Sequence, residues 1–122
     1  MFKIKANSSK NYLYIFLEGF LNDDEILQAT DTARSEARKL SPGFTIINNI
    51  GNYKPATQKA ADMIAKTQRY LSDIGAVRVI RIVGENVLGK YQWRRLQRQG
   101  GAAFEVIEVE SLADAKKIIE TE

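Results

Sequence analysis

The chain has 122 residues, of which 44% are hydrophobic and 27% charged, with a formal net charge of +3, so we expect one globular domain spanning residues 1–122. It contains no His and no Cys, which excludes Ser-His-Asp and Cys-His catalysis, disulfides and the usual zinc, haem and iron–sulfur sites. No apolar run approaches the roughly 18 residues that cross a bilayer, and no signal peptide is visible, so we expect a cytoplasmic protein.

The N-terminal residues predict a β-hairpin. Residues 2–6 alternate apolar and polar side chains, as in an edge strand, and a cluster of turn formers follows at residues 7–11. Residues 12–17 form a nearly continuous apolar run, which is typical of a strand inside a sheet. The short connection favours an antiparallel pair.

Helices and strands then alternate along the chain. Asn22, with Glu25 three residues later, predicts a helix N-cap of the capping-box type. The predicted elements are a helix from Asn22 to Leu40, a strand at 44–47, a helix from near Pro55 to Ile74, a strand at 77–83, a helix at 87–99, a strand at 104–109 and a last helix capped by Ser111. The order β-β-α-β-α-β-α-β-α predicts an α/β domain with a mainly parallel five-stranded sheet and an antiparallel N-terminal edge strand.

This pattern resembles a STAS-type domain (sulphate transporter and anti-sigma-factor antagonist), a group that includes related lipid-binding-like bacterial proteins. Leu17-Glu18-Gly19-Phe20-Leu21-Asn22-Asp23 is similar to the family's second strand and the polar entry to its first helix. Residues 44–52 are similar to the third strand and Arg81-Ile82-Val83-Gly84 to the fourth. The resemblance implies strands in roughly sequential order, helices packed on the sheet, and a non-catalytic regulatory or protein-binding role in a bacterial protein.

One motif of the family is missing. In antagonist-type members a phosphorylatable Ser, inside an Asp-Ser-Ser-Gly-like stretch, opens the helix after the third strand. Residues 49–57 occupy that place here and lack the stretch. Thr57 falls near the corresponding position, and a helix N-terminus favours a phosphate, so Thr57 is a candidate phosphoacceptor. The alternative is a Thr that makes a local hydrogen bond in the first turn.

The residues after the third predicted strand form the leading candidate site. We expect them to make a loop at the carboxyl edge of the parallel sheet, beside the segment that follows the fourth strand, where such sheets bind ligands. The candidate residues are Asn48, Asn49, Asn52, Tyr53 and Lys54. With the first turn of the next helix they would form a docking surface for another protein. The alternative is that Asn and Gly serve only as turn residues.

The helix predicted at residues 87–99 has a basic face. At about 100° per residue, Trp93 and Leu96 are expected to face the core. The candidate basic patch on the opposite side consists of Lys90, Arg94, Arg95 and Arg98. Residues 77–103 hold six Lys or Arg against one Glu, so nucleic acid, an anionic lipid or an acidic protein could bind there. The three Glu residues between 105 and 110 could instead neutralise the patch.

A third hypothesis is a carrier of a small apolar or anionic, lipid-like ligand. Tyr12, Tyr14 and Phe16 would line its pocket, with an arginine at the mouth. The acids at residues 23–25 have a sufficient role in starting a helix, and nothing else resembles a catalytic pair. We therefore expect neither an enzyme nor a cofactor or metal site, and an exposed sheet edge leaves a homodimer open.

Overall fold

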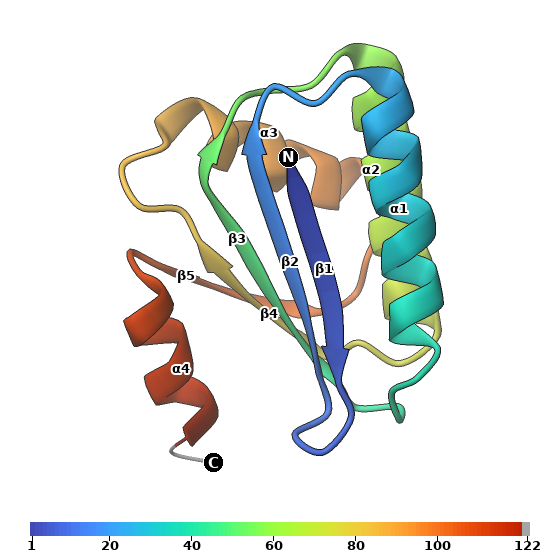
Figure 1. Cartoon of the computed structure of the whole chain (residues 1–122), viewed down its shortest axis with the longest axis vertical. Coiled ribbons are helices and arrows are strands. Elements are labelled where there is room, and N and C mark those ends of the chain that lie inside the picture. The colour runs from blue at the N-terminus through green and yellow to red at the C-terminus, as the bar shows by residue number, and fades with distance from the viewer. Residues whose placement is uncertain (121–122) are drawn as a thin grey trace.

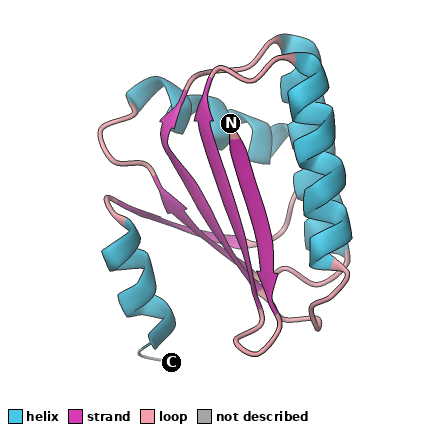
Figure 2. Cartoon of the chain, viewed as in Figure 1, coloured by secondary structure: helices cyan, strands magenta, loops and turns pink. Residues whose placement is uncertain are grey.

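The computed structural model describes residues 1–120 and has the predicted element order (Figures 1 and 2). The strands are β1 (Phe2–Asn7), β2 (Tyr12–Gly19), β3 (Thr45–Tyr53), β4 (Arg78–Ile82) and β5 (Glu105–Val109). The helices are α1 (Asp23–Ala37), α2 (Gln58–Asp73), α3 (Val87–Gly100) and α4 (Leu112–Glu120). Within this part of the chain the strands form one sheet in the order β1-β2-β3-β4-β5, antiparallel between β1 and β2 and parallel elsewhere. The predicted fold class is confirmed.

The sheet separates two cores of unequal size. Leu13, Ile15 and Leu17 of β2 face the larger core, which α1, α2 and α3 cover. Ile80 and Ile82 of β4 face the smaller core, which is closed by α4 alone. Since α4 packs mainly on β4 and β5, it leaves the β1–β2–β3 part of that sheet face only partly covered (Figure 1).

The helix starts follow from their capping residues. Asn22 caps α1 as predicted: its Oδ1 accepts from the Glu25 backbone N at 2.9 Å, and Glu25 Oε1 accepts from the Asn22 backbone N at 3.1 Å. α2 begins after Pro55, because Thr57 supplies the N-cap and its Oγ1 accepts from the Ala60 backbone N at 3.2 Å. Pro55 therefore lies outside the helix that we expected it to open.

β3 continues well past its predicted end at Ile47. The segment 48–54, predicted to be a loop, is strand as far as Tyr53, so that prediction is wrong. The reason is pairing with the end of β2, where Gly19 is the register partner of Tyr53 beyond a bulge between Phe16 and Glu18. This backbone pairing outweighs the turn preference of the Asn and Gly residues.

Candidate functional site

The segments that follow β3 and β4 lie side by side, as the sequence predicted. Asn86 lies in the connection from β4 to α3, and its Nδ2 donates to the carbonyl oxygens of Ile50 at 2.7 Å and of Tyr53 at 2.6 Å. Its Oδ1 accepts from the Gly89 backbone N at 3.0 Å. One side chain therefore caps α3 and joins that helix to the end of β3.

The five candidate docking residues do not form one exposed surface. Asn48 and Tyr53 are each 2% exposed, and the Tyr53 hydroxyl donates to Oε1 of Gln92 on α3. Burial raises the pKa of Tyr53 to about 12. Asn52 and Lys54 are exposed, and Asn49 lies on the opposite face of the sheet from Asn48. A partner could reach only part of this set.

Thr57 is exposed at the start of α2. Its hydroxyl donates to Oδ1 of Asp23 on α1 and accepts from the Ala60 backbone N, so it performs the local hydrogen-bonding role that the sequence left open. A phosphate on Thr57 would lie beside the Asp23 carboxylate, and this repulsion opposes the gain from the helix N-terminus.

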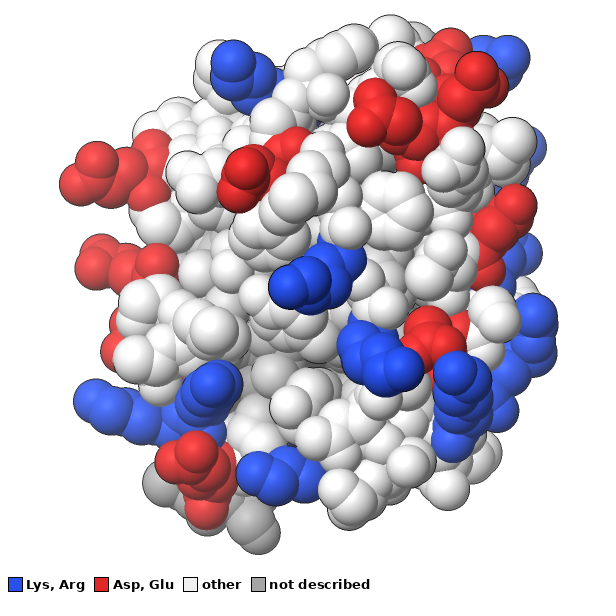
Figure 3. All heavy atoms as spheres, in the orientation of Figure 1, with Lys and Arg blue, Asp and Glu red and all other residues white. Residues whose placement is uncertain are grey.

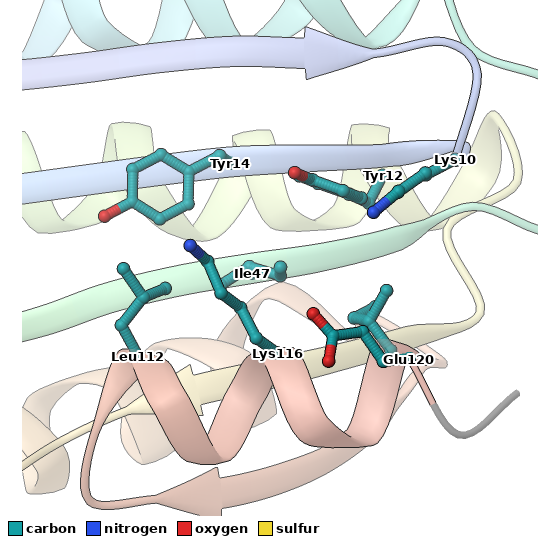
Figure 4. A pocket seen from close by; sticks show the side chains of 8 residues that line it. Lys10, Tyr12, Tyr14, Ile47, Leu112, Lys116 and Glu120 are labelled. Carbon is teal, nitrogen blue, oxygen red and sulfur yellow. The ribbon is translucent and has the colours of Figure 1, made fainter.

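A cavity of about 400 Å³ lies between β2 and α4 (Figure 4). Tyr12 and Tyr14 project from β2 toward α4, and Leu112 and Lys116 project back from α4. The residues that line this cavity, called here the tyrosine groove, are Lys10, Tyr12, Tyr14, Ile47, Leu112, Lys116, Ile119 and Glu120. An apolar floor with polar groups at its rim is the usual arrangement of a small-molecule site.

Asparagine side chains orient both tyrosine hydroxyls in this groove. Asn49 Nδ2 donates to the Tyr14 hydroxyl at 3.3 Å, and Asn7 Nδ2 donates to the Tyr12 hydroxyl at 3.4 Å. Each asparagine Oδ1 accepts from a backbone N–H, at 3.3 Å for Asn49 and 3.0 Å for Asn7, which fixes the direction of both amides. Within residues 1–120 neither hydroxyl donates a hydrogen bond, so both O–H protons are left for a ligand.

Among residues 1–120, cations outnumber acids around the groove. In this part of the chain Lys10 and Lys116 accompany one acid of the lining, Glu120, and an adjoining hollow that shares both tyrosines adds Lys5. Figure 3 shows basic side chains on both sides of a hollow in the lower part of the view. The cations are lysines rather than the predicted arginine, and Phe16 lies outside this lining.

α3 has the predicted orientation. Trp93 and Leu96 are buried and Lys90 is half-buried. Arg94 forms a two-pronged ion pair with Glu108 of β5, from Nε to Oε2 at 2.9 Å and from Nη2 to Oε1, which holds the pKa of the Glu108 carboxyl below its usual value. One of the predicted acids thus neutralises part of the basic patch. Its exposed members are Arg94, Arg95 and Arg98.

Arg81, one of the six cations between residues 77 and 103, is buried. It is 1% exposed, and its guanidinium lies 5.5 Å from the centre of the Trp93 ring. The strand pattern indicates this burial. Val79 and Val83 lie in the larger core, and Arg81 lies between them on the same face of the strand. Burial lowers the pKa of Arg81 to about 10.

Comparison with solved structures supports the fold. The chain is similar to a crystal structure of an uncharacterized protein of the DUF3478 family from Shewanella loihica PV-4, which has a SpoIIAA-like fold. The TM-score is 0.71 at 18% sequence identity, over 98% of this chain and 92% of the other. No family model and no curated protein matches the sequence. Within residues 1–120 no helix has the length and apolar character needed to cross a bilayer. The chain has a SpoIIAA-like fold, in agreement with the STAS-like domain that the sequence predicted.

Proposed function

We propose that this chain is a non-catalytic, STAS-like module that binds a small amphiphilic carboxylate in the tyrosine groove. The observation that carries the proposal is the pair of hydroxyl protons of Tyr12 and Tyr14, which the asparagine contacts leave free to donate. The two hydroxyls are held on opposite sides of β2, that of Tyr12 by Asn7 of β1 and that of Tyr14 by Asn49 of β3, so a carboxylate in the groove would accept from one of them at a time.

The remaining surface of the groove suits the rest of such a ligand. Ile47, Leu112 and Ile119 provide apolar contacts for a hydrocarbon body. Lys10 and Lys116 favour the charge of the head group by Coulomb attraction. The cavity of about 400 Å³ lies within the usual range for small-molecule sites, roughly 300–1,000 Å³.

A regulatory role follows if the bound ligand alters a docking surface. α4 forms one wall of the groove and packs mainly on β4 and β5. A ligand that fills the groove would bury apolar side chains of α4 and fix that helix against β2. A partner protein that recognises α4 would then distinguish the free from the bound module.

Titration calorimetry with decanoate, and with decanol as its uncharged counterpart, tests this proposal at fixed ionic strength. We expect decanoate to bind, and decanol to bind at least about tenfold more weakly because it lacks the charge. The variant Tyr14→Phe removes one O–H donor and keeps the ring, so its affinity for decanoate should fall about tenfold. Lys116→Gln should weaken binding less, since Lys116 lies at the open rim.

Two variants away from the groove serve as controls. Tyr91→Phe removes the hydroxyl of an exposed tyrosine on α3, and Lys59→Gln removes an exposed charge on α2, so both should bind decanoate as the wild type does. If the wild type binds neither ligand, the proposed function is wrong. If decanoate and decanol bind equally and Tyr14→Phe has no effect, the groove does not recognise a carboxylate.

A further inference from the structure

A buried arginine with two unpaired guanidinium nitrogens lies between β4 and α3. Arg81 is 1% exposed, and within residues 1–120 its Nε and Nη1 have no hydrogen-bond partner. The Trp93 ring, 5.5 Å from the guanidinium carbon, replaces only part of the lost hydration. A buried charge is unfavourable unless it is both paired and hydrogen-bonded. Arg81 therefore has unused capacity to bind an anion.

The nearest acid does not use that capacity. Glu108 is the register partner of Arg81 on the adjacent strand β5, but the two oxygens of its carboxylate accept from Arg94. The Glu108 charge opposes the lowering of the Arg81 pKa, whereas Arg94 adds to it. With a pKa of about 10, Arg81 stays protonated at neutral pH, beside a carboxylate already engaged elsewhere.

Arg81 lines a cavity of about 310 Å³ between α3 and β5. The residues that line this cavity, called here the arginine cavity, are Arg81, Arg94, Gln97, Arg98, Val106 and Glu108. Three arginines stand against one glutamate, so the cavity has an excess of two positive charges. Arginine presents paired N–H donors that fit the oxygens of a phosphate, and an excess of two charges matches its dianion.

We propose that the arginine cavity binds the phosphate dianion, either free or as the terminal group of a phosphomonoester. Arg81 attracts it by charge from the buried end, Arg98 donates from the exposed end, and Arg94 stays paired with Glu108 as one wall. The cavity lies on the α3 side of the sheet, whereas the tyrosine groove lies on the α4 side, so this inference is independent of the proposed function.

Contacts in a neighbouring hollow distinguish a phosphomonoester from free inorganic phosphate. It has a volume of about 530 Å³ and shares Arg94 and Arg98 with the arginine cavity. It adds Arg95, Leu88 and the exposed ring of Tyr91. The organic part of a phosphomonoester would lie against these apolar groups. Inorganic phosphate would leave them uncovered.

Titration calorimetry with inorganic phosphate, in chloride buffer at fixed ionic strength, tests the site. We expect the wild type to bind and both Arg98→Gln and Arg81→Met to weaken binding about tenfold or more. Arg98 is exposed, so its variant tests the cavity even if the Arg81 variant does not fold. Arg38→Gln is the matched control, because Arg38, at the end of α1, is an exposed arginine that lines neither the arginine cavity nor the neighbouring hollow.

The outcomes distinguish a built site from a general basic surface. Equal phosphate affinity of the wild type and Arg98→Gln would overturn the proposal, as would an equal loss of affinity in Arg98→Gln and Arg38→Gln. Tighter binding of phenyl phosphate than of inorganic phosphate, reduced by Tyr91→Ala, would identify a phosphomonoester site, and equal binding would identify a site for free phosphate. A single-stranded oligonucleotide provides a further test. If it binds more tightly than phosphate, and loses as much affinity in Arg95→Gln as in Arg98→Gln, the result overturns the phosphate site and favours the nucleic-acid hypothesis.

Discussion

Replacing Arg81 by methionine should stabilise the protein, although it removes the largest fully buried side chain. Burial lowers the pKa of this arginine from its ordinary value to about 10, and at about 1.4 kcal/mol per pKa unit the buried charge costs about 3 kcal/mol at neutral pH. Loss of the contact with Trp93 removes about 1 kcal/mol of cation–π attraction. Methionine fills a similar volume and has no charge to desolvate. We therefore expect the free energy of unfolding to rise by about 2 kcal/mol.

The pH dependence of this cost has a defined sign. The pKa is lower in the folded protein than in the unfolded chain, so the cost is fully present below about pH 10 and disappears as the pH rises through the folded pKa toward the unfolded one. The comparison should therefore be made near neutral pH, by urea unfolding in chloride buffer without oxyanions, with m-values checked for a common unfolded state.

Arg95→Met is the control for this experiment, because Arg95 is exposed on α3, and it should change the free energy of unfolding by less than about 0.5 kcal/mol. A lower stability of Arg81→Met than of the wild type would refute the reasoning, since it would mean that the guanidinium is well paired in the folded protein. Added phosphate should reduce the difference in free energy of unfolding between Arg81→Met and the wild type, because phosphate binds the wild type and stabilises it by mass action.

Three further predictions concern stability. Asn22→Ala should lower the free energy of unfolding by about 1 kcal/mol in urea, because the Asn22 Oδ1 that accepts from the Glu25 backbone N is lost, whereas the backbone N of residue 22 still donates to Glu25; an unchanged midpoint would contradict that role. Gly100→Ala should lower it by about 2 kcal/mol, because a Cβ there would lie 2.4 Å from the Ala65 carbonyl oxygen; an unchanged melting temperature would disprove this close approach of α3 to α2. The hydrogen bond from Lys39 holds the pKa of Glu36 below its ordinary 4.5 in the folded protein. The ionised Glu36 carboxylate therefore adds to the free energy of unfolding above pH 4.5, and this stabilisation is lost as the pH falls through the folded-state pKa. When stability is measured against pH in acid, it should fall more steeply for the wild type than for Glu36→Gln, and parallel curves would show that Glu36 makes no such contribution.

The sequence predicted the fold where the signals are local. Asn22 and Glu25 specify the start of α1 through contacts within four residues. The alternation of apolar runs with capped helical segments is enough to give the element order, and the short hairpin connection gives the one antiparallel pair. The end of β3 could not be found in this way, because it depends on pairing with β2 across a bulge, and the local residues Asn48 to Asn52 favour a turn.

The candidate sites depend on contacts between distant residues and were only partly predictable. Tyr12 and Tyr14 could be recognised as pocket residues, but Lys116 reaches them only because α4 packs on the far face of the sheet. Asn49 was singled out for a docking loop and instead orients the Tyr14 hydroxyl. The burial of Arg81 could have been predicted from strand alternation. The sequence offered neutralisation of α3 by the three Glu residues between 105 and 110, but it could not single out Glu108 as the one that pairs with Arg94.

The order of the strands also limits how copies of this chain can assemble. β1 and β5 form the two outer edges of the sheet, and β1 carries the exposed Lys3 and Lys5, whereas β5 begins with the exposed Glu105. Joining β1 to β1 would bring four ammonium groups together, which disfavours the homodimer at that edge. Joining β1 to β5 would pair opposite charges, but it is a head-to-tail contact that leaves one edge open at each end, so it would extend into a filament rather than close into a dimer.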